Sequence, residues 1–196
     1  MTRRGRDRAG GTSILAVPFI LGAGVALVVV ASRAGASRAA ADVNLCSGSL
    51  ATAGTVLDGQ PLSATQIGNA RIIYHVGTGM RVPGRAAVIA IATAMQESRL
   101  KNVPYGTSDS LGLFQQRPSR GWGTPAQIMR PRSAAITFYA RLVRVRGWRA
   151  LPLTVAAQDV QHSAYPDAYA QWEPLATDIA AMFSGCTARE AARQHT

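Results

Sequence analysis

Residues 83–98, PGRAAVIAIATAMQES, decide how the rest of this chain can fold. After the opening proline and glycine, which suit the start of a helix, the apolar residues from Ala86 to Met95 cover every side of the predicted helix. A helix that is apolar on all sides is buried all round. The sequence therefore predicts a buried helix that ends at Glu97 and Ser98, directly before a polar loop.

Glu97 is the first candidate for a chemical role. It is one of three glutamates in the chain, and its position gives it partial burial by the helix and an opening toward the loop. Burial favours the neutral form of a carboxyl group, so we expect a raised pKa. A carboxylic acid that stays protonated at neutral pH can protonate the leaving oxygen of a glycosidic bond. From position alone, the alternative is a structural ion pair with Arg99 or Arg81.

A second segment, Ser-Leu-Gly-Leu-Phe-Gln-Gln at residues 110–116, follows the loop. Together with Glu97-Ser98 it resembles the soluble lytic transglycosylase group of the lysozyme-like superfamily, in which a Gly-Leu-Met-Gln-type segment follows a helix that ends in Glu-Ser. Phe114 replaces the methionine here. The stretch 92–123, which ends in Arg-Pro-Ser-Arg-Gly-Trp-Gly, looks like the wall-associated branch of that group in high-GC Gram-positive bacteria. The resemblance covers roughly residues 63–183.

The resemblance implies a mainly α, lysozyme-like fold with a cleft for the glycan strands of bacterial peptidoglycan. It implies cleavage between N-acetylmuramic acid and N-acetylglucosamine, with Glu97 as the catalytic acid/base, 1,6-anhydro ends as products and no cofactor. Two alternatives stay open: a hydrolytic lysozyme (muramidase), and a catalytically inactive peptidoglycan-binding protein of the same fold. The latter is favoured by one departure, because Gln158 and Asp159 stand where the family's Ala-Ala-Tyr-Asn-Ala-Gly motif has Tyr and Asn.

The same resemblance assigns further residues to the cleft. Gln115 is expected to line it near the N-acetyl groups, and Gly112 to allow a close backbone approach. Ser98 is a substrate-binding candidate beside the catalytic carboxyl. Tyr169 looks like the late tyrosine that contacts this carboxyl in such enzymes. Trp122, which lies between two glycines, could stack on a sugar face or anchor the core, and both interpretations stay open.

A second carboxylate would decide the type of reaction. Asp109 lies in the loop that enters the Gly-Leu-x-Gln segment, and a place near the scissile bond would make a two-carboxylate hydrolase. Without it, Glu97 would act first as acid and then as base, while the 6-hydroxyl of the sugar displaces the leaving group. The alternative for Asp109 is a turn-stabilising role, because aspartate is favoured in turns.

The rest of the chain after residue 62 is also expected to be helical. Ser63 begins a capping box for a helix that runs to about Gly77, and Thr124-Pro125 starts a short helix by a cap and a first-turn proline. Residues 101–109 are loop-like, and no stretch predicts a strand or a repeat. Further helices are expected at residues 133–145, 153–161 and 168–183.

The N-terminal region predicts export. Residues 1–11 form a basic tail that should stay in the cytoplasm, and residues 12–31 form an uncharged apolar run long enough to cross a bilayer. The run predicts a transmembrane anchor, with a cleaved signal segment as the alternative because three alanines follow at 39–41. Residues 32–61 are expected to be a flexible linker, 62–186 the catalytic domain and 187–196 a C-terminal tail. The protein is thus expected at the cell membrane with its domain outside, or secreted to the wall.

Two cysteines, Cys46 and Cys186, lie at the borders of this domain and have no metal-type spacing. In an exported protein they predict one disulfide, with two free buried thiols as the alternative. The three histidines are scattered, so no metal site is expected.

The net charge is +11, of which residues 1–41 supply +5 with six arginines and one aspartate, and the rest +6. The N-terminal charge is a topology signal, and the remainder would attract an anionic cell wall. No nucleic-acid recognition motif is present, so nucleic acid is not expected as a partner. Expected partners are peptidoglycan strands, the membrane and other cell-wall enzymes.

Overall fold

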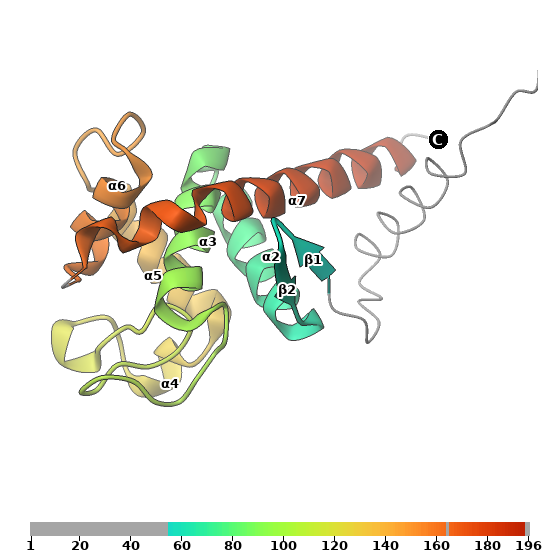
Figure 1. The fold of residues 1–196 in the computed structure, drawn as a ribbon. Helices are drawn as coiled ribbons and strands as arrows, with labels where there is room; N and C mark the ends of the chain where they lie inside the picture. The colour runs from blue at the N-terminus through green and yellow to red at the C-terminus, as the bar shows by residue number, and fades with distance from the viewer. Residues whose placement is uncertain (1–54, 164, 195–196) are drawn as a thin grey trace, which may run out of the picture. The chain divides into compact units, whose positions relative to one another are not determined.

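The computed structural model describes residues 55–163 and 165–194, and this part of the chain is mainly helical, as predicted (Figure 1). The α-helices are α2 (Ala64–Gly79), α3 (Gly84–Ser98), α4 (Pro125–Ile128), α5 (Pro131–Leu142), α6 (Leu153–Gln161) and α7 (Glu173–Arg193). Two 3-10 helices, η1 (Pro118–Arg120) and η2 (Pro166–Trp172), and a hairpin of β1 (Thr55–Leu57) and β2 (Gln60–Leu62) accompany them.

The helix α3 lies at the centre of the domain. It packs against α2, α5, α6, α7 and η2, and α7 crosses it in Figure 1. From Ala86 to Met95 every residue except Val88 is buried. This confirms the prediction of a helix buried all round. The helix ends where Arg99 adopts a left-handed conformation with φ 55° and ψ 41°, so the chain turns sharply just after Glu97 and Ser98.

Two predicted helix starts are confirmed by their hydrogen bonds. At the start of α2, the Gln66 backbone N–H donates to the Ser63 hydroxyl, and the Gln66 side-chain oxygen accepts from the Ser63 N–H at 2.9 Å. Thr124 and Gln127 form the same capping box at α4. Gln66 also donates through Nε2 to the Arg99 carbonyl at 2.7 Å, which ties the start of α2 to the end of α3.

The prediction of a linker without strands is wrong for its described part. Strands β1 and β2 pair antiparallel, with Thr55 opposite Leu62. Asp58 and Gly59 form the two-residue turn between them, and their φ angles of 46° and 68° are typical of a type I′ hairpin. Leu62 is buried and joins the core, so the hairpin is part of the domain. The remainder of the predicted linker, residues 32–54, lies outside the described residues.

The C-terminal helix also differs from its prediction. The expected helix 168–183 is divided, because Glu173-Pro174 begins the new helix α7 after η2. Helix α7 then continues to Arg193, so residues 187–193 are helical and not an irregular tail. The only residue after Phe183 that could end the helix is Gly185, and the helix continues through it because a single glycine is tolerated. A smaller shift affects α5, which begins at its first-turn Pro131 and ends at Leu142.

The core between α5 and its neighbours fixes the segment that follows the loop. Phe114 is fully buried and stacks on Phe138 of α5, with ring centroids 4.7 Å apart. The Tyr139 hydroxyl donates to the Ile73 carbonyl of α2 at 3.0 Å. The aromatic side chain of Phe114 therefore anchors the Gly-Leu-x-Gln segment to the scaffold.

The predictions of export and of a disulfide concern residues that lie largely outside the described part of the chain. The basic residues 1–11, the apolar run 12–31 and Cys46 all lie there. Among the described helices, none combines the length and the apolar character that a bilayer crossing needs. Cys186 is buried in α7 and is not a free cysteine. The anchor and the Cys46–Cys186 bridge stay predictions.

Candidate active site

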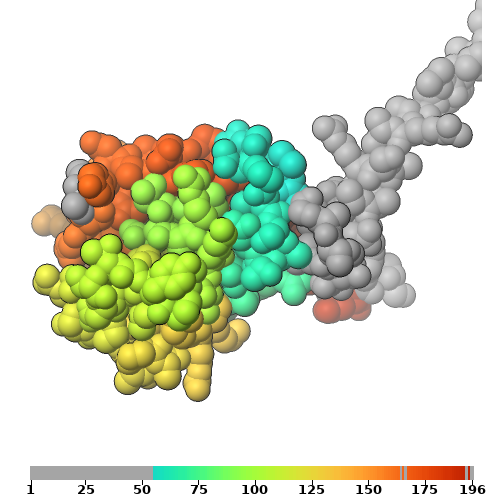
Figure 2. Space-filling model, turned by 60° about the horizontal axis from the view of Figure 1, so that its bottom comes forward, coloured from blue at the N-terminus to red at the C-terminus, as the bar shows by residue number. Residues whose placement is uncertain are grey.

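A cleft of about 760 Å³ opens beside the C-terminal end of α3. The surface of the segment after α3, green to yellow in Figure 2, adjoins the orange surface of the chain after α6. Both surfaces contribute to the cleft, together with α5. Its lining residues are Glu97, Thr107, Ser110, Gln115, Arg117, Arg120, Trp122, Arg141, Gln161, His162, Ser163 and Tyr165.

Glu97 stands half-buried in the wall of this cleft. Its Oε1 accepts a hydrogen bond from the Tyr169 hydroxyl at 2.8 Å, and the Gln161 side chain also donates to the carboxyl. Burial raises the pKa of Glu97 above its ordinary value, and the two hydrogen bonds oppose this effect without cancelling it. No arginine of the described part of the chain pairs with Glu97, so the structure does not support the expected alternative of an ion pair.

Tyr169 is fully buried behind the carboxyl, and the contact predicted for it is present. Burial, followed by the negative charge of Glu97, raises the pKa of its hydroxyl, which therefore stays protonated and can donate. The 3-10 helix η2 that carries it is attached to α3, because Trp172 Nε1 donates to Gln96 Oε1 at 2.8 Å. Arg99 covers the Trp172 ring at 4.2 Å from its centroid.

Ser98 and Gly112, both predicted to bind substrate, do not line the cleft. The Ser98 hydroxyl donates to the Leu113 carbonyl at 2.8 Å and so joins the end of α3 to the Gly-Leu-x-Gln segment. Gly112 has a φ of 75°, and a Cβ there would lie 2.9 Å from the Ile128 carbonyl oxygen. Its missing side chain therefore leaves room for the protein's own backbone.

Gln115 lines the cleft, as predicted. It adopts a φ of 47°, which is uncommon for a residue with a side chain. Its Nε2 donates to the Tyr105 carbonyl at 3.1 Å and to the Gly112 carbonyl at 3.3 Å. Any side chain at Gly106 would overlap the Gln115 amide. The amide is thus held by the loop before it.

Trp122 also lines the cleft, but it is only 7% exposed. The Arg141 guanidinium lies 3.6 Å above its ring centroid and covers one face. That face is therefore closed to a sugar, and the position agrees best with the anchoring interpretation.

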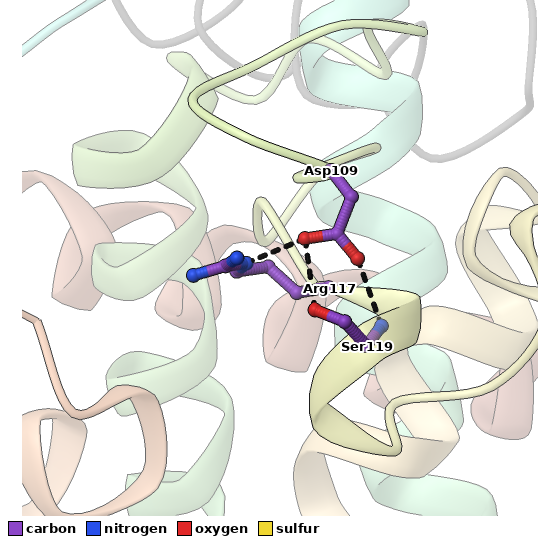
Figure 3. Close-up of polar contacts among 3 residues, drawn as sticks. All are labelled: Asp109, Arg117 and Ser119. Atoms are coloured by element: carbon purple, nitrogen blue, oxygen red, sulfur yellow. Dashed lines mark hydrogen bonds and ion pairs between the residues drawn. The ribbon is translucent and has the colours of Figure 1, made fainter.

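Asp109, the candidate second carboxylate, is engaged in its own loop (Figure 3). Its Oδ1 accepts from Arg117 Nε at 2.6 Å and from the Ser119 hydroxyl at 3.0 Å, and its Oδ2 accepts from the Ser119 N–H at 2.8 Å. The Arg117 bond, followed by the Ser119 bonds, holds the pKa of Asp109 far below its usual range. Asp109 does not line the cleft, and Glu97 is the only carboxylate among the described lining residues.

Helix α6 carries a site residue that the sequence analysis did not predict. Gln161 is the last residue of α6. Its side chain donates to Glu97 and, through Nε2, to the Phe114 carbonyl at 2.8 Å. Gln158 donates to the Ser163 carbonyl at 2.9 Å and so supports the turn after α6. The signal that could have found Gln161 is its place in residues 156–161, the stretch that departs from the Ala-Ala-Tyr-Asn-Ala-Gly motif of the group that the sequence resembles.

The cleft also contains arginines that the sequence motifs did not indicate: Arg117, Arg120 and Arg141. In the described part of the chain, no three side chains of His, Cys, Asp or Glu gather in a way that could hold a metal ion. No family model matches this chain, and no curated protein matches it significantly.

Proposed function

We propose that this protein cleaves the glycan strands of bacterial peptidoglycan between N-acetylmuramic acid and N-acetylglucosamine, and that its domain has a lysozyme-like fold. The observation that carries the proposal is Glu97, a half-buried carboxyl with a raised pKa in the wall of a cleft of about 760 Å³. Ligand clefts commonly measure about 300–1,000 Å³, so this one has the size of a ligand-binding cleft.

The first step uses Glu97 as a general acid. The protonated carboxyl gives its proton to the glycosidic oxygen, and the bond from this oxygen to C1 of N-acetylmuramic acid breaks. Burial favours the protonated form that this step needs, because it raises the pKa. The hydrogen bonds from Tyr169 and Gln161 then stabilise the carboxylate that the step leaves behind.

The second step uses the same group as a base. The Glu97 carboxylate takes the proton of the sugar's own 6-hydroxyl, whose oxygen attacks C1 and closes a 1,6-anhydro ring. Glu97 is then protonated again and ready for another cycle. A route with one carboxylate agrees with the cleft, because Asp109 is bound to Arg117 and Ser119 and does not line it. Hydrolysis would need a second carboxylate at roughly 5–5.5 Å or 6.5–9.5 Å from the first.

The place of action belongs to the same proposal. A cell-wall substrate requires that the domain be outside the membrane, either attached through residues 12–31 or released after cleavage of that segment. We propose the anchored form, with peptidoglycan strands and other cell-wall enzymes as partners.

The origin of the new sugar ends tests the route of cleavage. Purified sacculi are digested in heavy-oxygen water, and the released muropeptides are weighed by mass spectrometry. We expect 1,6-anhydro ends without heavy oxygen, because the nucleophile is part of the sugar. The variant Asp109→Asn should give the same unlabelled products, with its rate lowered by less than about tenfold, since it perturbs only the loop. Labelled reducing ends that disappear in Asp109→Asn would instead establish a two-carboxylate hydrolase.

A further inference from the structure

The cleft continues beyond the catalytic region along a positively charged wall. A second hollow of about 320 Å³ shares Arg141 and His162 with it and adds Arg144 and Asp159. Because two lining residues are common to both, the two hollows are adjacent. We call Arg120, Arg141 and Arg144 the arginine arm; they come from η1, α5 and the turn after α5.

No ion pair in the described part of the chain includes a member of the arginine arm. The guanidinium groups of Arg120 and Arg144 have no hydrogen-bond or ion-pair partner in the described residues, and both residues are exposed. Arg117, by contrast, is paired with Asp109 and is not counted in the arm. Asp159 lines the second hollow, but none of the ion pairs found in the described residues includes it.

Arg141 is the fixed member of the arm. Its Nη2 donates to the carbonyls of Arg120 and Gly121 at 3.2 and 2.9 Å, and its plane lies on the Trp122 ring. Its Nε and Nη1 donate to no group in the described part of the chain. A guanidinium held in this way has lost most of its freedom before a ligand arrives, so a new hydrogen bond costs little further ordering.

The repulsion between Arg141 and Arg144 also favours binding of an anion. Desolvation, followed by repulsion from Arg144, lowers the pKa of Arg141. Arg141 and Arg144 line the second hollow together, and neither forms an ion pair with Asp159, which lines it too. An anion bound between the two cations would relieve their mutual repulsion.

We infer that the arginine arm binds a carboxylate carried by the glycan strand, so that the enzyme binds acidic strands in preference to neutral ones. Arginine binds carboxylates through paired, charge-assisted hydrogen bonds, which a neutral sugar cannot accept equally well. In peptidoglycan such a carboxylate has two sources: the peptide stem, and the lactyl group of muramic acid after the stem is removed. The inference rests on the proposed function, because it assumes a glycan in the cleft.

Binding to three glycans tests the inference without cleavage. The full chain carrying Glu97→Gln, kept in non-ionic detergent, is titrated with stem-bearing glycan strands, with strands stripped of their stems, and with neutral N-acetylglucosamine oligomers of similar length. We expect at least one acidic glycan to bind at least about tenfold more tightly than the neutral one, the effect of one charge-assisted contact. Tighter binding of stem-bearing strands locates the carboxylate in the peptide, and tighter binding of stripped strands locates it on the lactyl group.

The double variant Arg120→Gln/Arg144→Gln should abolish this preference and leave the affinity for the neutral oligomer within about threefold. The matched control is Arg132→Gln/Arg146→Gln, which removes the same charge at two exposed positions. Arg132 lies on α5, as Arg141 does, but lines a different hollow beside Arg71. The control should keep the preference.

Three results would overturn the inference. Equal affinity for acidic and neutral glycans would refute a carboxylate site while leaving glycan binding intact. An equal loss of preference in both double variants would show that net charge, and not the arm, attracts the strand. If no glycan binds and the wild-type chain releases no fragments from sacculi, the proposed function fails and takes the inference with it.

Discussion

At the carboxyl of Glu97 two opposed effects determine the proton affinity. Desolvation disfavours the charged form, and the hydrogen bonds from Tyr169 and Gln161 favour it. The desolvation is the larger effect, which leaves the pKa raised. A group that must give a proton and take one back works best when neither form is strongly preferred. In the proposed reaction the two hydrogen-bond donors therefore matter as much as the burial of the carboxyl does.

The pH dependence of Tyr169→Phe tests this balance. The variant removes a donor that lowers the pKa of Glu97, so the pKa should rise further and the alkaline limb of the kcat/KM profile should move to higher pH. The rate at the optimum should fall, because the carboxylate formed in the first step loses its partner. The pH profiles of sacculus digestion by the two proteins provide the measurement, and an alkaline limb that moves to lower pH would contradict the account.

At the scale of the elements, the contact between α2 and α5 depends on Gly77. A Cβ there would lie 2.9 Å from the Tyr139 hydroxyl oxygen, which is buried and bonded to Ile73. We expect Gly77→Ala to lower the free energy of unfolding by about 1–3 kcal/mol, the usual cost of overpacking. Gly68→Ala is the matched control in the same helix, because a Cβ at Gly68 meets nothing within 4 Å.

Urea unfolding of both variants measures the two effects. Gly68→Ala should stabilise by up to about 1 kcal/mol, since alanine is the better helix former. If Gly77→Ala proves as stable as Gly68→Ala, the packing of α2 on α5 is not as described.

The elements that could be predicted are those whose signals are local. The capping boxes at Ser63 and Thr124 and the apolar run of α3 each lie within a few residues, and each forms as predicted. The hairpin was missed because its strands are too short to show alternation, although Asp58-Gly59 is a hairpin turn signal. The extent of α7 was missed because no strong stop signal follows Phe183, and its contacts with α3 and α2 come from distant parts of the chain.

The residues of the site also differ in whether a local sequence signal indicates them. Glu97 and Gln115 come from the two segments that carry the resemblance, and both line the cleft. Ser98 and Gly112 come from the same two segments, but Ser98 bonds the Leu113 carbonyl and Gly112 leaves room for the Ile128 carbonyl. The arginine arm could not be found in the sequence, because Arg120 joins Arg141 and Arg144 only when α5 packs beside η1.

At the scale of the whole molecule, the predicted disulfide would join the two borders of the domain. Closing so long a loop stabilises by as much as about 4–5 kcal/mol in the chain-entropy model. Thiol alkylation of the protein, purified without reductant, should label neither Cys46 nor Cys186, and reduction should expose both to the reagent and lower the melting temperature. Full labelling of both cysteines before reduction would refute the bridge.

The most direct test of the central claim compares the wild-type chain with Glu97→Gln on purified sacculi. The variant should keep its fold. Because the native pKa of Glu97 is raised, its contribution to stability is fully present below the unfolded pKa and is lost as pH rises through the folded pKa. Removing the charge should therefore leave the melting temperature at pH 7 unchanged or higher.

Mass spectrometry of the released muropeptides is the measurement that decides. The wild-type chain should release glycan fragments, and the folded Glu97→Gln variant should release them at least roughly 10²-fold more slowly, because it has lost its only acid and base. Release by the variant at the wild-type rate would contradict the assignment of Glu97.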